Sequence, residues 1–185
     1  MDEKKELFER CVSGEQVYKG RLLDVRRDEI ILPDGKPSAR EYIRHIGAVC
    51  IVPLTSDGRV IVERQFRYPV GDVMTEIPAG KLDTKDEDRL SAAKRELREE
   101  TGFSADEWTF LGDYYPTPAY SDERISMYLA RGLNGGSRHL DDDEFLNVET
   151  VSLEDLVNDV LCGKITDGKT QAAVLKTAIL LNKKI

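Results

Sequence analysis

The sequence predicts an α+β fold, because its strand-like and helix-like segments come in separate groups. Several segments rich in strand-forming residues precede one helical segment, more strand-like segments follow it, and two helical segments close the chain. A parallel βαβ series would instead alternate strands with helices. The chain of 185 residues suits one domain, or one domain with an N-terminal extension, and it is long enough to bury a sizeable core.

The N-terminal part of the chain is predicted to be rich in β-hairpins. Strand-forming residues gather at 16–25, 30–32, 41–45, 48–54 and 60–66. The segment Pro33-Asp34-Gly35-Lys36 is a turn signal, and Ser56-Asp57-Gly58 joins the last two of these strands. We therefore expect a small β-extension over residues 1–40, followed by the main domain over residues 41–185.

Charge and composition limit the partners. The net charge of −8 argues against a nucleic acid or an anionic membrane, because either would require a basic surface. A small phosphorylated substrate remains compatible with this negative net charge, since a bound metal ion can make the local field positive. No apolar run approaches the roughly 20 residues of a membrane span, and Met1 to Lys5 lack the apolar core of a signal peptide. Cys11, Cys50 and Cys162 are odd in number and widely spaced, which indicates reduced thiols. A cytoplasmic location is expected.

The segment from Asp88 to Thr101 is predicted to form an amphipathic helix. Its apolar positions recur at i, i+3 and i+7, as Leu90, Ala93 and Leu97. Thr84 followed three residues later by Glu87 resembles a capping box at the start of the helix. Gly102 stands where a helix commonly ends. Both ends of the helix are therefore marked in the sequence.

Acidic residues lie on this helix where an ordinary surface helix would not place them. Glu96 and Glu100, four residues apart, border the apolar stripe. Glu99 and Glu100 occupy the last turn, where the helix dipole disfavours a negative charge by roughly 0.3–1 kcal/mol. A hard divalent cation such as Mg²⁺ would offset this cost, and Arg95 could pair with Glu99 one turn later. The alternative interpretation is a solvated acidic helix end.

A longer spaced pattern surrounds these acids. Gly80 is followed by six residues, then Glu87, seven more residues, and the run Arg-Glu-Leu-x-Glu-Glu-x-Gly-Phe from Arg95 to Phe103. This pattern closely resembles the signature of the Nudix hydrolases. The family has five residues between the glycine and the first glutamate, so this chain carries one extra residue within 81–86. The resemblance covers about residues 42–183 and implies an α/β/α sandwich with a mixed β-sheet, preceded by a small N-terminal β-element.

The resemblance also implies a Mg²⁺ site, with Mn²⁺ as an alternative ion. Its ligands would be the carboxylates of Glu96, Glu99 and Glu100 and the backbone carbonyl of Ala79. Gly80 would allow a backbone turn that leaves this carbonyl free to face the cation. As in the family, Glu87 would position Arg95 and the acidic cluster.

The implied reaction is hydrolysis of a nucleoside diphosphate linked to another group, and the first expectation is ADP-ribose cleaved to AMP and ribose 5-phosphate. A nucleotide sugar such as GDP-mannose is one alternative, because nothing in the sequence reads the base directly. A non-catalytic ADP-ribose sensor on the same fold is another, although a sensor need not keep metal ligands. Relatives with an N-terminal extension pair through it, so a homodimer is expected.

Some residues outside the signature are candidates for substrate binding. They are Arg64, Arg67, Tyr68 and Pro118. The first three end a predicted strand, where guanidinium groups suit phosphate and the ring suits a base; a solvated strand end is the alternative. The proline lies 15 residues after Phe103, in a rigid loop that resembles the loop of the ADP-ribose pyrophosphatase branch. A structural turn is the alternative for this loop.

The general base is sought in the run of acids from Asp141 to Glu144, which precedes Phe145. Such a run is usually a solvated loop. In a metal-dependent pyrophosphatase it can instead carry a base on a mobile loop. The family's pattern of glutamate before an aromatic residue favours Glu144, with Asp142 next. The catalytic candidates are therefore Glu87, Arg95, Glu99, Asp142 and Glu144.

The remaining segments are predicted to be structural. Strands are expected at 108–115 and 125–130, followed by a flexible polar segment at 132–139. Ser152 would cap a short helix, and residues 170–183 have the pattern of a final amphipathic helix.

Overall fold

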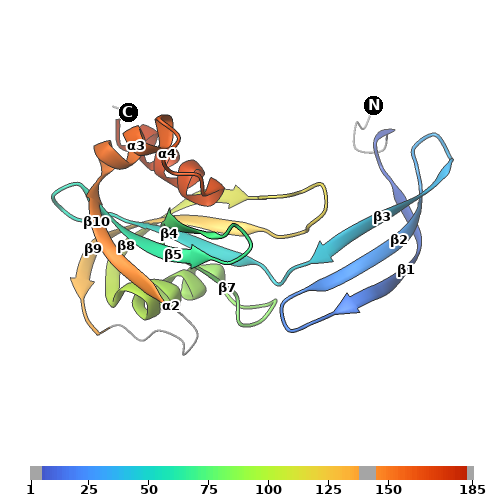
Figure 1. Ribbon diagram of the computed structural model, residues 1–185, viewed down its shortest axis with the longest axis horizontal. Coiled ribbons are helices and arrows are strands. Elements are labelled where there is room, and N and C mark those ends of the chain that lie inside the picture. Colours follow the sequence, from blue (N-terminus) through green and yellow to red (C-terminus); the bar gives the residue numbers. More distant parts are fainter. Residues whose placement is uncertain (1–5, 138–144, 183–185) are drawn as a thin grey trace. The chain divides into compact units, whose positions relative to one another are not determined.

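The computed structural model describes residues 6–137 and 145–182 (Figure 1). Its strands are β1 (Arg10–Lys19), β2 (Asp24–Ile31), β3 (Pro37–Arg44), β4 (Ala48–Pro53), β5 (Arg59–Arg67), β6 (Asp72–Glu76), β7 (Ala79–Lys81), β8 (Phe103–Tyr114), β9 (Ile125–Gly135) and β10 (Leu146–Ser152). Its helices are α2 (Arg89–Thr101), α3 (Leu153–Leu161) and α4 (Gly168–Asn182). These elements form two compact units. The smaller unit holds the chain up to His45 and Thr117–Glu123, and the larger unit holds Ile46–Pro116 and the chain from Arg124.

The smaller unit is built on an antiparallel sheet in the order β1-β2-β3. The turn between β2 and β3 forms where the sequence predicts it: the Leu32 N–H donates to the Lys36 carbonyl at 2.9 Å, and Gly35 has a φ of 86°. Glycine suits this position, because a side chain is strained at positive φ. Strand β1 is exposed over its whole length. Its exposed large apolar side chains are Val12, Val17 and Tyr18. The predicted N-terminal β-element is therefore present, and one of its edges carries unburied apolar side chains.

The loop Thr117–Glu123 also belongs to the smaller unit. Its backbone bonds to the end of the sheet, since the Ile43 N–H donates to the Tyr120 carbonyl at 2.8 Å. The Asp122 carboxylate accepts the His45 N–H at 2.6 Å. The proline-containing loop is thus tied to strand β3 and the residues after it.

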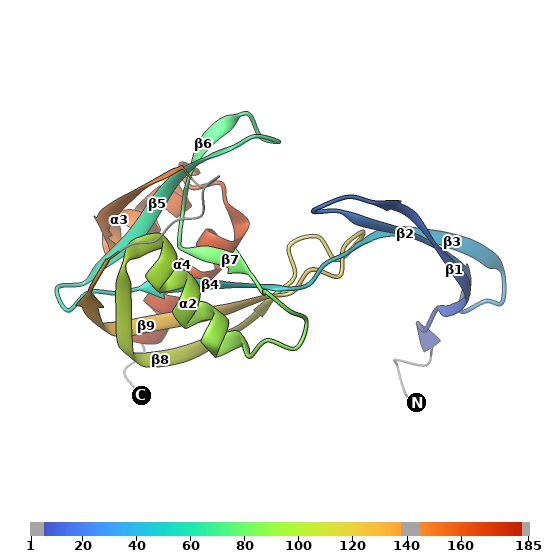
Figure 2. The same cartoon turned by 90° about the horizontal axis from the view of Figure 1, so that it is seen from below.

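The larger unit contains two sheets in its described residues. One is antiparallel, in the order β10-β5-β6. The other has the order β7-β4-β9-β8, in which β4 and β9 are parallel and the other neighbours are antiparallel. The predicted mixed sheet is therefore confirmed. Helix α2 covers one side of this sheet, and α3 and α4 lie on the other side (Figures 1 and 2).

Strand β4 is buried along its entire length. Val49 and Ile51 face one side, where they join a cluster with apolar residues of α2. Cys50 and Val52 face the other side and join a cluster with apolar residues of α4. A strand covered on both faces needs a continuous apolar sequence, which Ala-Val-Cys-Ile-Val-Pro provides. The apolar stripe predicted for the helix therefore packs against one half of a core that β4 divides.

Some strands are not indicated by the sequence. Strands β6, β7 and β10 are short or rich in polar residues, and their pairing partners supply the backbone hydrogen bonds that define them. The prediction of a flexible segment from Gly132 is wrong as far as Gly135, because these residues continue β9 and pair with the start of β8. The predicted cap of α3 is confirmed: the Ser152 hydroxyl accepts the Asp155 N–H at 3.0 Å.

In the described residues, the helices are too short and too polar to traverse a lipid bilayer. The chain's cysteines, all of them described, are free thiols: Cys11 and Cys162 are exposed and Cys50 is buried. Burial raises the pKa of the Cys50 thiol to about 12, so this side chain acts as a neutral core residue.

Candidate active site

Helix α2 begins four residues later than its predicted capping box would place it. Its N-cap is Asp88, whose carboxylate accepts the Ser91 N–H at 2.8 Å. The predicted box of Thr84 and Glu87 is wrong, because the Glu87 carboxylate accepts the Asp83 N–H at 2.7 Å instead. The C-terminal end is as predicted: Gly102 has a φ of 78°, and its N–H donates to the Arg98 carbonyl.

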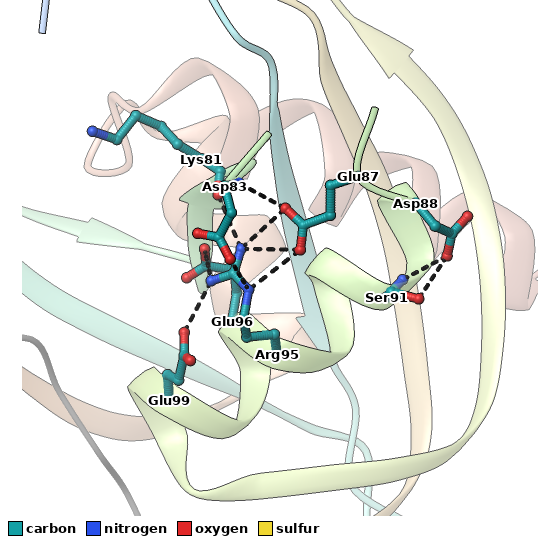
Figure 3. A network of polar contacts seen from close by, with 8 residues as sticks. All are labelled: Lys81, Asp83, Glu87, Asp88, Ser91, Arg95, Glu96 and Glu99. Carbon is teal, nitrogen blue, oxygen red and sulfur yellow. Dashed lines mark hydrogen bonds and ion pairs between the residues drawn. The ribbon is translucent and has the colours of Figure 1, made fainter. Parts of the chain in front are cut away.

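The Arg95 guanidinium lies among acids from both the helix and the loop before it (Figure 3). Its Nη1 donates to Glu96 at 2.8 Å and to Glu99 at 3.0 Å. Its other contacts are with Glu87 at 3.4 Å, Asp83 at 3.3 Å and the Lys81 carbonyl at 3.2 Å. The predicted contacts of Arg95 with Glu99 and Glu87 are confirmed.

The contacts within this cluster keep Arg95 and Glu87 charged. Partial burial alone would lower the pKa of Arg95, but the Glu87 hydrogen bond and the carboxylates of Glu96 and Glu99 outweigh it and raise that pKa. The Asp83 N–H and then Arg95 hold the pKa of Glu87 below its usual range. Arg95 is therefore a fixed cation at the centre of several carboxylates.

Glu96 and Glu100 are buried, with 8% and 4% of their surface exposed. The prediction that both border the apolar face of the helix is confirmed. The Glu100 carboxylate accepts the Ala79 N–H at 2.9 Å, which joins the last turn of α2 to strand β7. Burial of a charged carboxylate is costly unless it is paired or binds a cation, so the negative charges of Glu96 and Glu100 must be balanced by nearby positive groups or hydrogen-bond donors.

Gly80 gives the Glu96 carboxylate its place. A Cβ atom on residue 80 would lie 2.0 Å from Glu96 Cδ and 2.2 Å from each carboxylate oxygen. The interpretation of Gly80 as a backbone turn is wrong: it lies within β7, pairs with Val49, and is absent from the positive-φ residues. Glycine is needed here because no side chain fits between the strand and the carboxylate.

Within residues 6–137 and 145–182, no group of three or more His, Cys, Asp or Glu side chains is arranged to hold a metal ion. Arg95 instead bridges Glu96 and Glu99. Neighbouring carboxylates repel one another, and a guanidinium placed between them reduces this repulsion. Arg95 therefore already balances the charges of Glu96 and Glu99.

The comparisons with known proteins agree with this geometry. The sequence model of the NUDIX domain matches residues 44–173, which include strand β7 and helix α2. The chain belongs to the Nudix family. Residues 9–43 match a second model, described as the nucleoside diphosphate sugar hydrolase N-terminal domain.

Similar proteins match almost the whole chain. An ADP-ribose pyrophosphatase from Bacillus subtilis is 38% identical over 97% of this chain and 100% of its own length. A methanol dehydrogenase activator from Bacillus methanolicus is 36% identical, over 90% of both chains. A crystal structure of an ADP compounds hydrolase superposes with a TM-score of 0.83 at 26% identity, covering 94% of each chain. The Nudix α+β fold is therefore shown.

Nudix hydrolases generally use divalent metal ions. The residues of this Nudix chain fit such an ion, because α2 offers carboxylate oxygens, the atoms that hard cations prefer. The missing side chain of Gly80 leaves room for one of these carboxylates against the backbone. The site thus has the right donor atoms in a partly buried setting.

The substrate-binding candidates lie in different surroundings. Arg64, on β5, is half exposed and lies 4.0 Å from Glu149 of β10. Arg67, at the end of β5, contacts Glu76, and Tyr68 after it is 87% exposed. Pro118 is exposed in the loop of the smaller unit. Of these candidates, only Arg67 has two hydrogen bonds to a buried carboxylate among the described residues.

Sequence reasoning missed the polar cluster around Glu76. This carboxylate contacts both Arg67 and Lys169, and Lys169 also lies 3.1 Å from Asp167. Glu76 precedes the Ile-Pro-Ala-Gly segment, and an acid within such an apolar stretch was a usable signal. The general-base candidates Glu144 and Asp142 lie outside the described residues.

Proposed function

We propose that this Nudix chain hydrolyses the pyrophosphate bond of ADP-ribose to AMP and ribose 5-phosphate, with Mg²⁺ as the preferred ion and Mn²⁺ as an alternative. The observation that carries the proposal is the pair of buried carboxylates, Glu96 and Glu100, against the backbone of Ala79 and Gly80. The nearly full-length likeness to a protein named ADP-ribose pyrophosphatase supports the choice of substrate.

The ion would be held by the carboxylates of Glu96, Glu99 and Glu100 and by the Ala79 carbonyl. When bound, a divalent ion neutralises charge on a pyrophosphate and makes its phosphorus easier for water to attack. Hydrolysis adds the oxygen of water to one phosphorus, breaks the bridging P–O bond, and leaves two phosphate monoesters. The chain's own residues must supply the cation site, the substrate contacts and the base.

Arg95 would exchange partners as the ion binds. It now bridges Glu96 and Glu99, yet it also contacts the Glu87 carboxylate and the Lys81 carbonyl. The positive charge of Arg95 would therefore still be balanced by Glu87 when the helix carboxylates bind the ion. Arg95 would also keep the loop before α2 in place. Glu87 acts through Arg95, as the sequence predicts.

Arg64 and Arg67 are proposed to bind phosphate oxygens of the substrate, because a guanidinium matches their geometry. Tyr68 would stack on the base, and Pro118 would shape the loop that favours ADP-ribose. Glu144 is the first proposed base for activating water, with Asp142 next and Glu99 as a further candidate.

The proposal includes a homodimer that pairs through the N-terminal β-element, and a cytoplasmic location. The support for pairing is the exposed edge strand β1 with its apolar side chains. In analytical ultracentrifugation, Val17→Lys is expected to shift the full chain from dimer toward monomer. Leu161→Lys changes another exposed apolar residue, at the end of α3, and is expected to leave the mass unchanged.

The direct test is a substrate panel with product identification. The protein with Mg²⁺ should convert ADP-ribose to equal amounts of AMP and ribose 5-phosphate, and EDTA should stop the reaction. Faster turnover of GDP-mannose would assign the activity to nucleotide sugars. Binding of ADP-ribose in calorimetry without turnover at any Mg²⁺ or Mn²⁺ concentration would identify a sensor instead.

A further inference from the structure

Glu76 is a buried carboxylate with two cationic partners. Arg67 donates to it from Nε and Nη2, each at 2.7 Å, so that both carboxylate oxygens are engaged. Lys169 reaches the same carboxylate from the first turn of α4. Two cations therefore share the Glu76 carboxylate, and Lys169 also lies 3.1 Å from Asp167.

The two cations differ in their access to solvent. The Arg67 side chain is 40% exposed, whereas the Lys169 side chain is 11% exposed and the Glu76 side chain 4%. Arg67 can therefore turn toward a solute without leaving the protein surface. Lys169 is enclosed and cannot reach a solute.

Lys169 is held in place by the start of its own helix. Asp167, directly before α4, accepts the Thr170 N–H at 2.9 Å and the Thr170 hydroxyl at 2.6 Å. The Thr170 hydroxyl accepts the Ile77 N–H at 3.0 Å, one residue after Glu76. The helix start is thus fixed to the end of β6, and Lys169 is directed at Glu76.

The pKa shifts agree with a Glu76 charge that is balanced jointly by Arg67 and Lys169. Burial would raise the pKa of Glu76, but the Arg67 hydrogen bond and the charge of Lys169 outweigh it and lower that pKa. The Glu76 hydrogen bonds raise the pKa of Arg67 against the effect of burial, and the charges of Asp167 and Glu100 add to the rise. Arg67 is therefore within electrostatic reach of an acid of α2.

We propose that Lys169 is a positioning residue: it stays on Glu76 when Arg67 leaves this carboxylate to bind a phosphate group of the substrate. Without Lys169, the departure of Arg67 would leave a buried carboxylate unbalanced, and substrate would have to compete with Glu76 for the guanidinium. The inference rests on the proposed function, because it takes Arg67 as the ligand of a substrate phosphate.

The test compares steady-state kinetics on ADP-ribose for the wild type and Lys169→Met, which keeps the length of the side chain. If Arg67 binds substrate and transition state equally, the variant should raise KM about tenfold and change kcat less than about threefold. Lys169→Arg should keep KM within about threefold of the wild type, because it restores the cation. Thermal melting of each variant shows that the fold is retained.

The double variant Glu76→Gln with Lys169→Met distinguishes the proposed release of Arg67 from Glu76 from a general effect of Lys169 on packing. It has no carboxylate to hold Arg67, so its KM should return to within about threefold of the wild-type value. Lys176→Met is the matched control, since Lys176 lies on the same helix and donates to the Leu111 carbonyl at 2.8 Å. Its KM should be unchanged.

Several outcomes would overturn the proposal. An unchanged KM in a folded Lys169→Met variant would show that Arg67 needs no second cation. A fall in kcat at constant KM would mean that Lys169 acts on the chemical step. An equally raised KM in the double variant would show that Lys169 acts otherwise than through Glu76.

A second measurement keeps the proposal separate from the proposed function. If the wild type fails to hydrolyse ADP-ribose, the assignment of activity fails, but the exchange is still testable by NMR with inorganic pyrophosphate as the probe. The Arg67 Nε–H signal, assigned with an Arg67→Lys variant, should shift in the wild type and not in Lys169→Met at the same concentration. No shift in the wild type, or equal shifts in both, would contradict the exchange.

Discussion

Replacing Gly80 with alanine is expected to lower kcat/KM by at least about 100-fold, or about 2.7 kcal/mol of barrier. The added Cβ would lie 2.0 Å from Glu96 Cδ, whereas ordinary contact begins at 3.4 Å. The carboxylate or the strand must therefore move by the difference, about 1.4 Å. A misplacement of about 1 Å in an active site costs on the order of 10²-fold in rate. The displaced group is a proposed metal ligand, so the Mg²⁺ concentration for half-maximal rate should also rise.

The assay is the initial rate on ADP-ribose over a range of Mg²⁺ concentrations. Gly135→Ala is the matched control: Gly135 also lies in a strand, and its Cβ would meet Phe103 at 3.8 Å, an ordinary contact. Its kcat/KM should stay within about twofold of the wild type.

Two results would refute the reasoning about Gly80. A folded Gly80→Ala variant that keeps kcat/KM within about threefold would show that the position of the Glu96 carboxylate does not matter. Adding Gly80→Ala to Glu96→Gln should cause little further loss, because both changes act on one carboxylate. Losses that multiply would show that Gly80 serves another purpose.

The remaining predictions concern the acids and the loop around the site. Glu100→Gln and Glu96→Gln should each reduce turnover by several orders of magnitude. In Glu100→Gln the melting temperature should hold or rise, because one negative charge fewer then lies in the last helical turn. An unchanged rate in Glu100→Gln would remove the metal assignment. Lys85 is exposed and lies in the turn where the Glu87 N–H donates to the Thr84 carbonyl at 3.2 Å. Deleting it should keep kcat/KM within about tenfold of the wild-type value, a change in the barrier of about 1.4 kcal/mol. Complete loss of activity in a folded variant would show that the extra residue sets the register of the site. Glu144→Gln should lower kcat with little change in KM, and Asp142→Asn should do less; the reverse order in the same kinetic assay would move the base to Asp142.

Helix α2 was predictable because its information is local. The apolar stripe needs only the spacing of Leu90, Ala93 and Leu97, and Gly102 marks the end of the helix by itself. The start was harder, because Thr84 and Asp88 are both good caps. The choice between them depends on Glu87, which binds the Asp83 N–H and Arg95 rather than the helix start.

The partners of Glu76 were beyond local reasoning. Glu76 and Lys169 are 93 residues apart, and they meet only because α4 begins beside the end of β6. The sequence gives no indication of β6, whose pairing with β5 brings Glu76 to Arg67. The chemistry of Arg67 therefore predicts that it binds phosphate, whereas its partners Glu76 and, through Glu76, Lys169 have no local signal.

Gly80 shows a different limit. The sequence marks it as special, and glycine is special either for its backbone angles or for its size. Only the approach of Glu96 from another element decides between these reasons. The same limit applies to the predicted metal ligands. The spacing of Glu96, Glu99 and Glu100 places them on one helix face, but it does not reveal that the Arg95 guanidinium lies between Glu96 and Glu99.

Strand β4 has a consequence for how the larger unit unfolds. Its backbone is paired with β7 on one side and β9 on the other, and its side chains enter both apolar clusters. Neither cluster can open while the other stays closed, since each loses its central wall when β4 detaches. The amide protons of β4 should therefore exchange with solvent only through global opening, and calorimetry should record the larger unit as one cooperative transition.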